Sequence, residues 1–166
     1  MAGLATLAFG GGCHWCTEAV FASLRGTTVT QGFAGSDPPD EAMSEAALVE
    51  HDEAVIPLSA LVAVHLRTHA AGSDHAMRGK YRSAVYTTDE AQAEAARAAL
   101  AAEADALGPL VTRVLPLRAF EPSRPEFRRY YETRGPEAPF CRAYIDPKLA
   151  RVRREFGRLV REEGAG

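Results

Sequence analysis

The sequence predicts an α+β protein built on a ferredoxin-like, split βαβ core. Apolar runs typical of strands alternate with helical patterns in the order β-α-β-β-α-β, which is the order of that arrangement. The length of 166 residues suits one domain. Hydrophobic residues make up 46% of the chain and charged residues 25%, an ordinary globular balance. We therefore expect a single domain, residues 1–166, that folds around its own core.

The first strand and helix of this core are separated by a run of glycines. Residues 4–9 form an apolar run that predicts a strand, and the glycines at 10–12 predict the turn that ends it. The apolar spacing of residues 13–25 predicts a helix. Residues 29–34 are the second strand candidate and lead into a stretch rich in proline and aspartate.

The next strand and helix follow the same logic. Residues 45–51 are predicted to form the third strand, and Pro57 is well placed as the first residue of the second helix. Its apolar and histidine side chains follow the spacing of one buried face: Leu58, Leu61, Val62, His65, Leu66 and His69. Residues 70–80 are expected to form a loop.

The second half of the chain adds a helix and a strand to the core and ends in a coil-rich segment and a terminal helix. Gly108 marks the end of an alanine-rich helical run. Several prolines without a clean period predict coil, and the last apolar stripe predicts an amphipathic helix. The expected ranges are strand 83–87, helix 89–107, strand 110–115, coil 116–147 with a short helix near 126–132, and helix 149–160.

Charge and hydropathy narrow the class of partner. Lys and Arg number 19 and Asp and Glu 22, so the net charge of −3 offers no basic surface for nucleic acid. No apolar run approaches the roughly 18–20 residues of a membrane span, and the start of the chain does not look like a signal peptide. We expect a cytoplasmic protein with no membrane partner. The lack of a heptad seam favours a monomer.

Cys13 is the leading candidate for chemistry. A glycine turn between a strand and a helix would place its thiol at the first helical turn, where unpaired N–H groups and the helix dipole favour a thiolate. The thiolate is the nucleophilic form of cysteine. The alternative is that Cys13 and Cys16 are small buried hydrophobic residues, as free cysteines often are.

Residues 11–21, Gly-Gly-Cys-His-Trp-Cys-Thr-Glu-Ala-Val-Phe, resemble the signature of the peptide methionine sulfoxide reductase A family, which usually has Phe in place of His14. The likeness continues in matching order along nearly the whole chain. The further similar segments are 31–35, 44–46, 80–86, 140–141 and 145–148. The chain is therefore similar to an enzyme that reduces methionine S-sulfoxide, free or peptide-bound, to methionine.

The resemblance implies the roles of several residues. Cys13 would attack the sulfoxide sulfur and become a sulfenic acid. Glu45 and Tyr81 would protonate and hydrogen-bond the sulfoxide oxygen, which is otherwise a poor leaving group. Trp15 would pack against the S-methyl group of the substrate.

A second thiol must then resolve the sulfenic acid as an intramolecular disulfide. The resemblance implies Cys141 for this step, on a coil that could swing, with Cys16 as the alternative because it lies three residues after Cys13. The disulfide would be reduced by thioredoxin or a similar external dithiol. No metal or other cofactor is expected.

Two departures from the family pattern bear on substrate binding. His14 makes one side of the site polar and ionisable near neutral pH. Phe33 stands where the family usually has a tyrosine, so one hydroxyl donor is missing. Together with Trp15, these residues are the predicted substrate-binding set, and a family member with changed or lost activity is a further possibility.

Two other classes of function stay open on the residues alone. Cys13 and Cys16 form a Cys-x-x-Cys pair, so a thioredoxin-type dithiol–disulfide oxidoreductase is one alternative. A metal-binding module that uses Cys13, Cys16, Cys141 and a histidine is another, although a single Cys-x-x-Cys supports it weakly. His65 and His69 have the i, i+4 spacing of a metal pair, but their place on the apolar face favours packed, hydrogen-bonded histidines.

Overall fold

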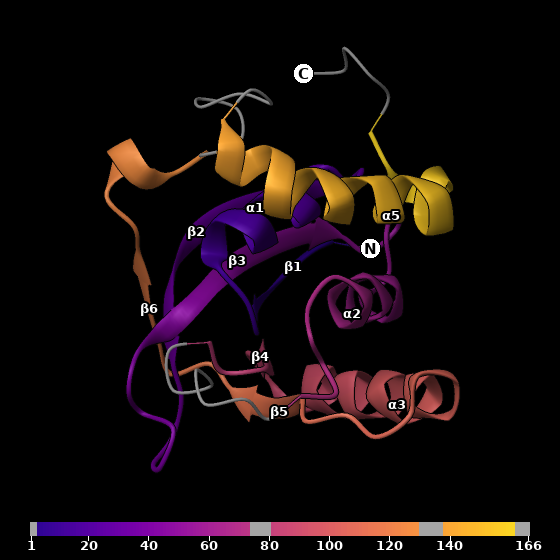
Figure 1. The fold of residues 1–166 in the computed structure, drawn as a ribbon. Coiled ribbons are helices and arrows are strands. Elements are labelled where there is room, and N and C mark those ends of the chain that lie inside the picture. Colours follow the sequence, from indigo (N-terminus) through magenta and orange to yellow (C-terminus); the bar gives the residue numbers. More distant parts are fainter. Residues whose placement is uncertain (1–2, 74–80, 130–137, 162–166) are drawn as a thin grey trace.

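A mixed six-stranded sheet forms the centre of the computed structural model, which describes residues 3–73, 81–129 and 138–161 (Figure 1). The strands lie in the order β5-β4-β1-β3-β2-β6. Neighbours pair antiparallel except β4 and β5, which are parallel. The strands are β1 (Leu4–Gly10), β2 (Thr27–Gly35), β3 (Ser44–Asp52), β4 (Ala84–Thr87), β5 (Arg113–Pro116) and β6 (Ala119–Pro122).

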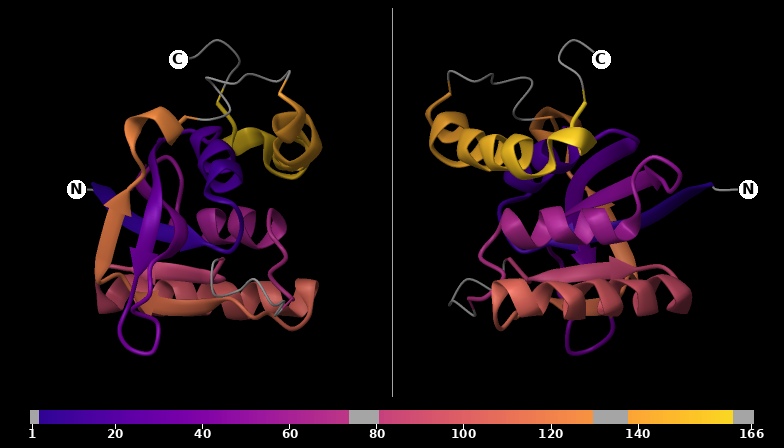
Figure 2. Two further views of the ribbon diagram at one scale, coloured as in Figure 1. Left: turned by 60° about the vertical axis from the view of Figure 1, so that its left-hand side comes forward. Right: turned by 90° about the vertical axis from the view of Figure 1, so that its right-hand side faces the viewer.

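Helices pack against one face of this sheet. They are α1 (His14–Ala22), α2 (Leu58–Arg67), α3 (Glu90–Leu107) and α5 (Asp146–Phe156). Figures 1 and 2 show α5 beside α1 at one end of the helical layer and α3 at the other end, with α2 between them. The main hydrophobic core joins side chains of all these helices to alternate residues of the central strands, such as Leu7, Phe9, Val49 and Val85. None of the described helices is long and apolar enough to cross a membrane.

The predicted α+β class is confirmed, and strands β1 to β4 follow the predicted chain order within a few residues at each end. Strand β5 begins at Arg113 rather than at residue 110. The reason is that β4 starts at Ala84, which pairs with Arg113, so the residues before Arg113 have no parallel partner in the ladder.

The prediction of coil over 116–147 is wrong in two places. Strand β6 pairs with the end of β2 at one edge of the sheet, where prolines are tolerated because one side of an edge strand needs no ladder hydrogen bonds. Further on, a π-helical turn, η3 (Cys141–Ile145), runs directly into α5. The terminal helix, expected over 149–160, thus begins earlier, at Asp146. It ends at Phe156, where a 3-10 turn, η4 (Gly157–Leu159), follows it.

The short helix expected near 126–132 is present only as a 3-10 turn, η2 (Pro125–Phe127). The last residues of that prediction lie outside the described part of the chain, as does most of the loop expected at 70–80.

The glycine turn after β1 is held by the second helix. Gly11 has a φ of +146°, and a Cβ placed there would lie 2.5 Å from the His69 ring. The Nε2 atom of His65 lies 2.7 Å from the carbonyl oxygen of Gly10, and Nε2 of His69 lies 2.8 Å from Oγ of Ser83. The prediction that both histidines are packed and hydrogen-bonded is confirmed. This turn fixes where α1 begins.

Candidate active site

Cys13 occupies the N-cap position of α1. Its φ and ψ of −58° and 132° are not helical, and its carbonyl accepts the first helical hydrogen bond from Thr17 N–H at 3.1 Å. The thiol is partly exposed. The pKa of Cys13 is lowered, chiefly by a hydrogen bond from the Cys16 side chain. Hydrogen bonds from the backbone N–H groups of Trp15 and Cys16 lower it further. Burial and the negative charge of Glu45 act in the opposite direction and raise it. The site therefore favours a Cys13 thiolate, the nucleophilic form.

Cys16 is the thiol partner of Cys13. It lies one turn along α1 and is 6% exposed. Its pKa is strongly raised, first because its side chain hydrogen-bonds Cys13 and second because it is buried. Of the two sulfurs, Cys13 therefore ionises and Cys16 keeps its proton. Cys16 also belongs to the main hydrophobic core cluster, and Cys13 packs against that cluster.

Cys141 completes a group of three free thiols. It is the first residue of η3 and is fully buried in the same core cluster as Cys16. Burial and then the charge of Asp146 raise the pKa of Cys141, and the charge of Cys141 in turn raises the pKa of Cys16. The expectation that Cys141 lies on a coil is wrong, because η3 and α5 pack this segment onto α1.

Glu45 lies at the start of β3 beside the first turn of α1. Its side chain is buried, and Oε1 accepts a hydrogen bond from the backbone N–H of His14 at 3.2 Å. The Nε2 atom of the His14 ring lies 3.4 Å from the same oxygen. A carboxylate at a helix N-terminus is stabilised by the unpaired N–H groups there. The buried carboxyl group is therefore held close to Cys13.

His14, Trp15, Phe33 and Phe140 form an aromatic cluster next to Cys13. The ring centroids of His14 and Phe33 are 5.2 Å apart, and those of Trp15 and Phe140 are 5.4 Å apart in an edge-to-face contact. Phe33 pairs with Glu45 across strands β2 and β3. The predicted substrate-binding residues therefore lie on the same side of the site as the buried carboxyl group.

Tyr81 is placed near this region by a contact of the next residue, Arg82. The backbone N–H of Arg82 donates to Oγ of Ser44 at 2.8 Å, which holds the half-buried Tyr81 next to the residue before Glu45. The structure thus brings Glu45 and Phe33 together with the first turn of α1 and places the backbone at Tyr81 beside the start of β3. Sequence reasoning missed Ser44, Phe140 and the carbonyl of Gly32, although Ser44 and Phe140 each adjoin a predicted site residue.

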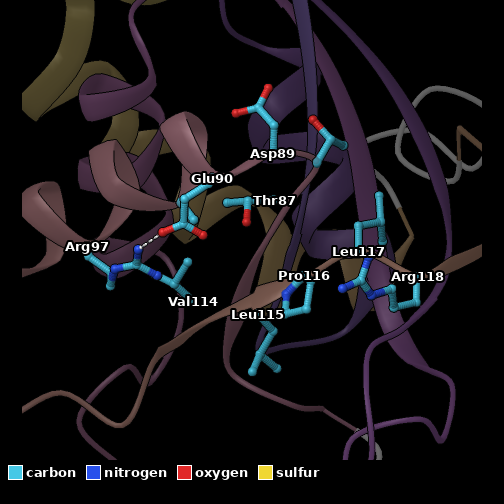
Figure 3. A pocket seen from close by; sticks show the side chains of 11 residues that line it. Thr87, Asp89, Glu90, Arg97, Val114, Leu115, Pro116, Leu117 and Arg118 are labelled. Carbon is cyan, nitrogen blue, oxygen red and sulfur yellow. Dashed lines mark hydrogen bonds and ion pairs between the residues drawn. The ribbon is translucent and has the colours of Figure 1, made fainter.

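A cavity of about 300 Å³ lies elsewhere, where the C-terminal ends of β4 and β5 meet the N-terminus of α3 (Figure 3). Thr87, Arg97 and Arg118 are among its lining residues, and Arg97 pairs with Glu90 beside it. Because β1 and β4 are antiparallel, with Gly10 opposite Ala84, this cavity lies at the other end of those strands from Cys13. It is separate from the cysteine site.

The described part of the chain gives no support to the metal-binding alternative. Within residues 3–73, 81–129 and 138–161, no three His, Cys, Asp or Glu side chains are grouped so that they could hold a metal ion. A low-pKa thiolate with a thiol partner and a buried carboxyl group defines a thiol-dependent redox enzyme. Comparison with known proteins identifies the kind of enzyme.

The chain belongs to the peptide methionine sulfoxide reductase family, whose model matches residues 5–159. It is 35% identical over 175 aligned residues to the peptide methionine sulfoxide reductase MsrA of Halobacterium salinarum, with 93% of this chain and 97% of that protein covered. Among solved structures, methionine sulfoxide reductase A of Corynebacterium diphtheriae superposes with a TM-score of 0.65 at 25% identity, over 80% of this chain and 76% of that one.

The fold is also that of Mxr1 from Saccharomyces cerevisiae in complex with Trx2, with a TM-score of 0.59. The two chains are 18% identical, and the match covers 71% of this chain and 79% of that one. The family match identifies the protein as an oxidoreductase. The predicted resemblance is confirmed.

Proposed function

We propose that the protein reduces methionine S-sulfoxide to methionine with Cys13 as the nucleophile. The observation that carries this proposal is the Cys13 thiolate at the N-cap of α1, hydrogen-bonded by Cys16 and close to the buried Glu45 carboxyl group. The thiolate attacks the sulfoxide sulfur, and the oxygen passes to Cys13 with uptake of one proton. The products are methionine and a Cys13 sulfenic acid, so the substrate sulfur is reduced by two electrons and Cys13 is oxidised by two.

Glu45 supplies the proton for the leaving oxygen, and the Tyr81 hydroxyl assists by hydrogen bonding. The support for Glu45 is its burial beside Cys13, since a water-poor setting strengthens charge stabilisation in the transition state. Tyr81 is supported by the anchoring of Arg82 on Ser44. Trp15 and Phe33 offer apolar ring surface to the S-methyl group of the substrate, and His14 lies between them and Glu45.

Cys16 resolves the sulfenic acid first, and Cys141 acts second. Both thiols are buried, but Cys16 lies one turn from Cys13 on α1 and hydrogen-bonds it, whereas Cys141 belongs to a separate element, η3. The Cys16 sulfur attacks the Cys13 sulfur, the S–O bond breaks, and water leaves as the disulfide forms. Attack by Cys141 on Cys16 would then move the disulfide to Cys16–Cys141 and release Cys13 as a thiolate.

An external dithiol of the thioredoxin type completes the cycle. The yeast protein Mxr1, which shares this fold, is seen in complex with Trx2, and a protein disulfide is the normal substrate of such dithiols. No cofactor enters these steps. We further propose that the chain acts as a single domain and a monomer in the cytoplasm, where three free cysteines suit a reducing compartment.

Turnover of the separate S and R epimers of dabsyl-methionine sulfoxide, with dithiothreitol as reductant, tests the proposal. Turnover of the S epimer alone, abolished in Cys13→Ser, is the expected result. The hydrogen-bonded Cys13–Cys16 pair also suits a dithiol–disulfide oxidoreductase, so insulin disulfide reduction is measured in parallel. Insulin reduction without turnover of either epimer would replace the proposed function with that one.

A further inference from the structure

His14 makes contacts at both of its ring nitrogens. Nδ1 lies 3.2 Å from the carbonyl oxygen of Gly32. A carbonyl oxygen only accepts hydrogen bonds, so Nδ1 carries a hydrogen atom. The other ring nitrogen, Nε2, lies 3.4 Å from Oε1 of Glu45.

The His14 ring and the Glu45 carboxyl group lie close enough to share one proton. With a neutral imidazole and an ionised carboxylate, a lone pair of Nε2 would face a lone pair of Oε1. A single proton removes this repulsion, either on Nε2 as an ion pair or on the carboxyl oxygen. The backbone N–H of His14 donates to the same oxygen at 3.2 Å and keeps the carboxyl group in place in both states.

Among the described residues around the ring, few other groups could take this proton. On β2, the residues packed against the ring are Gly32 and Phe33, neither of which is charged. Strand β6 places the exposed Glu121 opposite Phe33, and Tyr81 lies near the start of β3. Cys13 precedes His14 in the chain. Among these groups, Glu45 is the one at ion-pair distance from the imidazole.

We propose that His14 and Glu45 share the proton that the reduction consumes, with His14 as a positioning residue that acts through Glu45. This inference rests on the proposed function. When the Cys13 thiolate attacks, the S–O bond of the sulfoxide breaks, an S–O bond to Cys13 forms, and the shared proton moves to that oxygen through the Glu45 carboxyl group. Water then restores a proton to the pair. The imidazole is a second site for that proton, at ion-pair distance from the carboxyl oxygen.

The test is a single-turnover experiment, which avoids the pH dependence of a recycling thiol. Reduced enzyme is mixed with dabsyl-methionine S-sulfoxide without reductant, and the rate of methionine formation is followed from pH 5.5 to pH 9. His14→Phe keeps an aromatic ring of similar size against Phe33 but has no ring nitrogen. His14→Gln keeps a polar side chain that does not titrate, and it serves as the second variant if His14→Phe does not fold.

We expect the loss of rate in both variants to grow with pH and to reach about tenfold or more at pH 8, since general acid catalysis contributes about 10²–10⁴-fold. Substrate affinity should change less than the rate. In a Glu45→Gln background, His14→Phe should cause little further loss, because the partner through which it acts is gone.

Two results would overturn the inference: an equal loss at every pH, or losses that add fully in the double variant. Either result would mean that His14 has only a packing role and does not act through Glu45. Failure of the proposed function looks different, because wild-type enzyme would then form no methionine from the S epimer at any pH.

Discussion

Replacement of Cys16 by alanine should raise the pKa of Cys13. The hydrogen bond from Cys16 is the largest cause that lowers this pKa. A hydrogen bond to a charged group contributes about 1.5–3 kcal/mol, and one pKa unit corresponds to about 1.4 kcal/mol. The free energy lost corresponds to a thiolate fraction about 10- to 100-fold smaller, so alkylation of Cys13 at pH 6 should slow by about the same factor.

The assay is alkylation by iodoacetamide as a function of pH, with quantification of the Cys13 peptide by mass spectrometry. Peptide mapping separates Cys13 from Cys16 and Cys141. Cys16→Ser is the matched control, because a serine hydroxyl can still donate a hydrogen bond to the thiolate. An unchanged midpoint in Cys16→Ala, or the same shift in both variants, would refute the role of this hydrogen bond.

Three further predictions concern the carboxyl group, the glycine turn and a surface ion pair. Glu45→Gln should reduce the single-turnover rate at pH 7 by about 10²-fold or more; a rate within threefold of wild type would exclude Glu45 as the proton donor. Gly11→Ala should destabilise the protein to urea by about 1–3 kcal/mol, because of the positive φ and the contact with His69. Gly12→Ala is its control, since its Cβ would have only an ordinary contact at 3.9 Å; equal losses would contradict this reasoning. The pKa of Asp40 is lowered in the folded protein, first by its hydrogen bond to Arg113. The ionised Asp40 therefore stabilises the fold above the usual pKa of aspartate, and this stabilisation is lost as the pH falls through the lowered pKa of the folded state. Asp40→Asn should therefore be less stable than wild type at pH 7, by no more than about 1 kcal/mol because Arg113 is half exposed. Near pH 2 the two proteins should be equally stable. A loss of stability at pH 2 but not at pH 7 would contradict the role of the ion pair.

The local pattern of the sequence was sufficient for much of the fold. Strands such as β1 and β3 and helices such as α2 have strong apolar periodicity, so their type and approximate ends could be predicted. Strand β6 could not be predicted, because it is a short edge strand between prolines and its partner β2 is distant in the chain. The helical turn at Cys141 could not be predicted either, because it packs onto α1, which is distant in the chain.

Some residues of the candidate site could likewise be predicted from local sequence, and others could not. The position of Cys13 followed from the glycine turn, which is a local signal. The importance of Glu45 depended on resemblance, because a single glutamate on a strand is usually exposed, whereas this one is buried against α1. The contacts of His14 with Gly32 and Glu45 join residues 18 and 31 positions apart. No sequence period encodes such contacts, so only the structure could supply them.

The most direct test of the account is disulfide mapping after a single turnover. Fully reduced enzyme is mixed with one equivalent of methionine S-sulfoxide, alkylated, digested and examined by mass spectrometry, together with a count of the methionine formed. The account predicts one methionine per enzyme and a disulfide that joins Cys16 to Cys13 or, after exchange, to Cys141. In a Cys16→Ala, Cys141→Ala variant, Cys13 should remain as a sulfenic acid that dimedone traps. Methionine formed while Cys13 stays a free thiol in that variant would contradict the central claim.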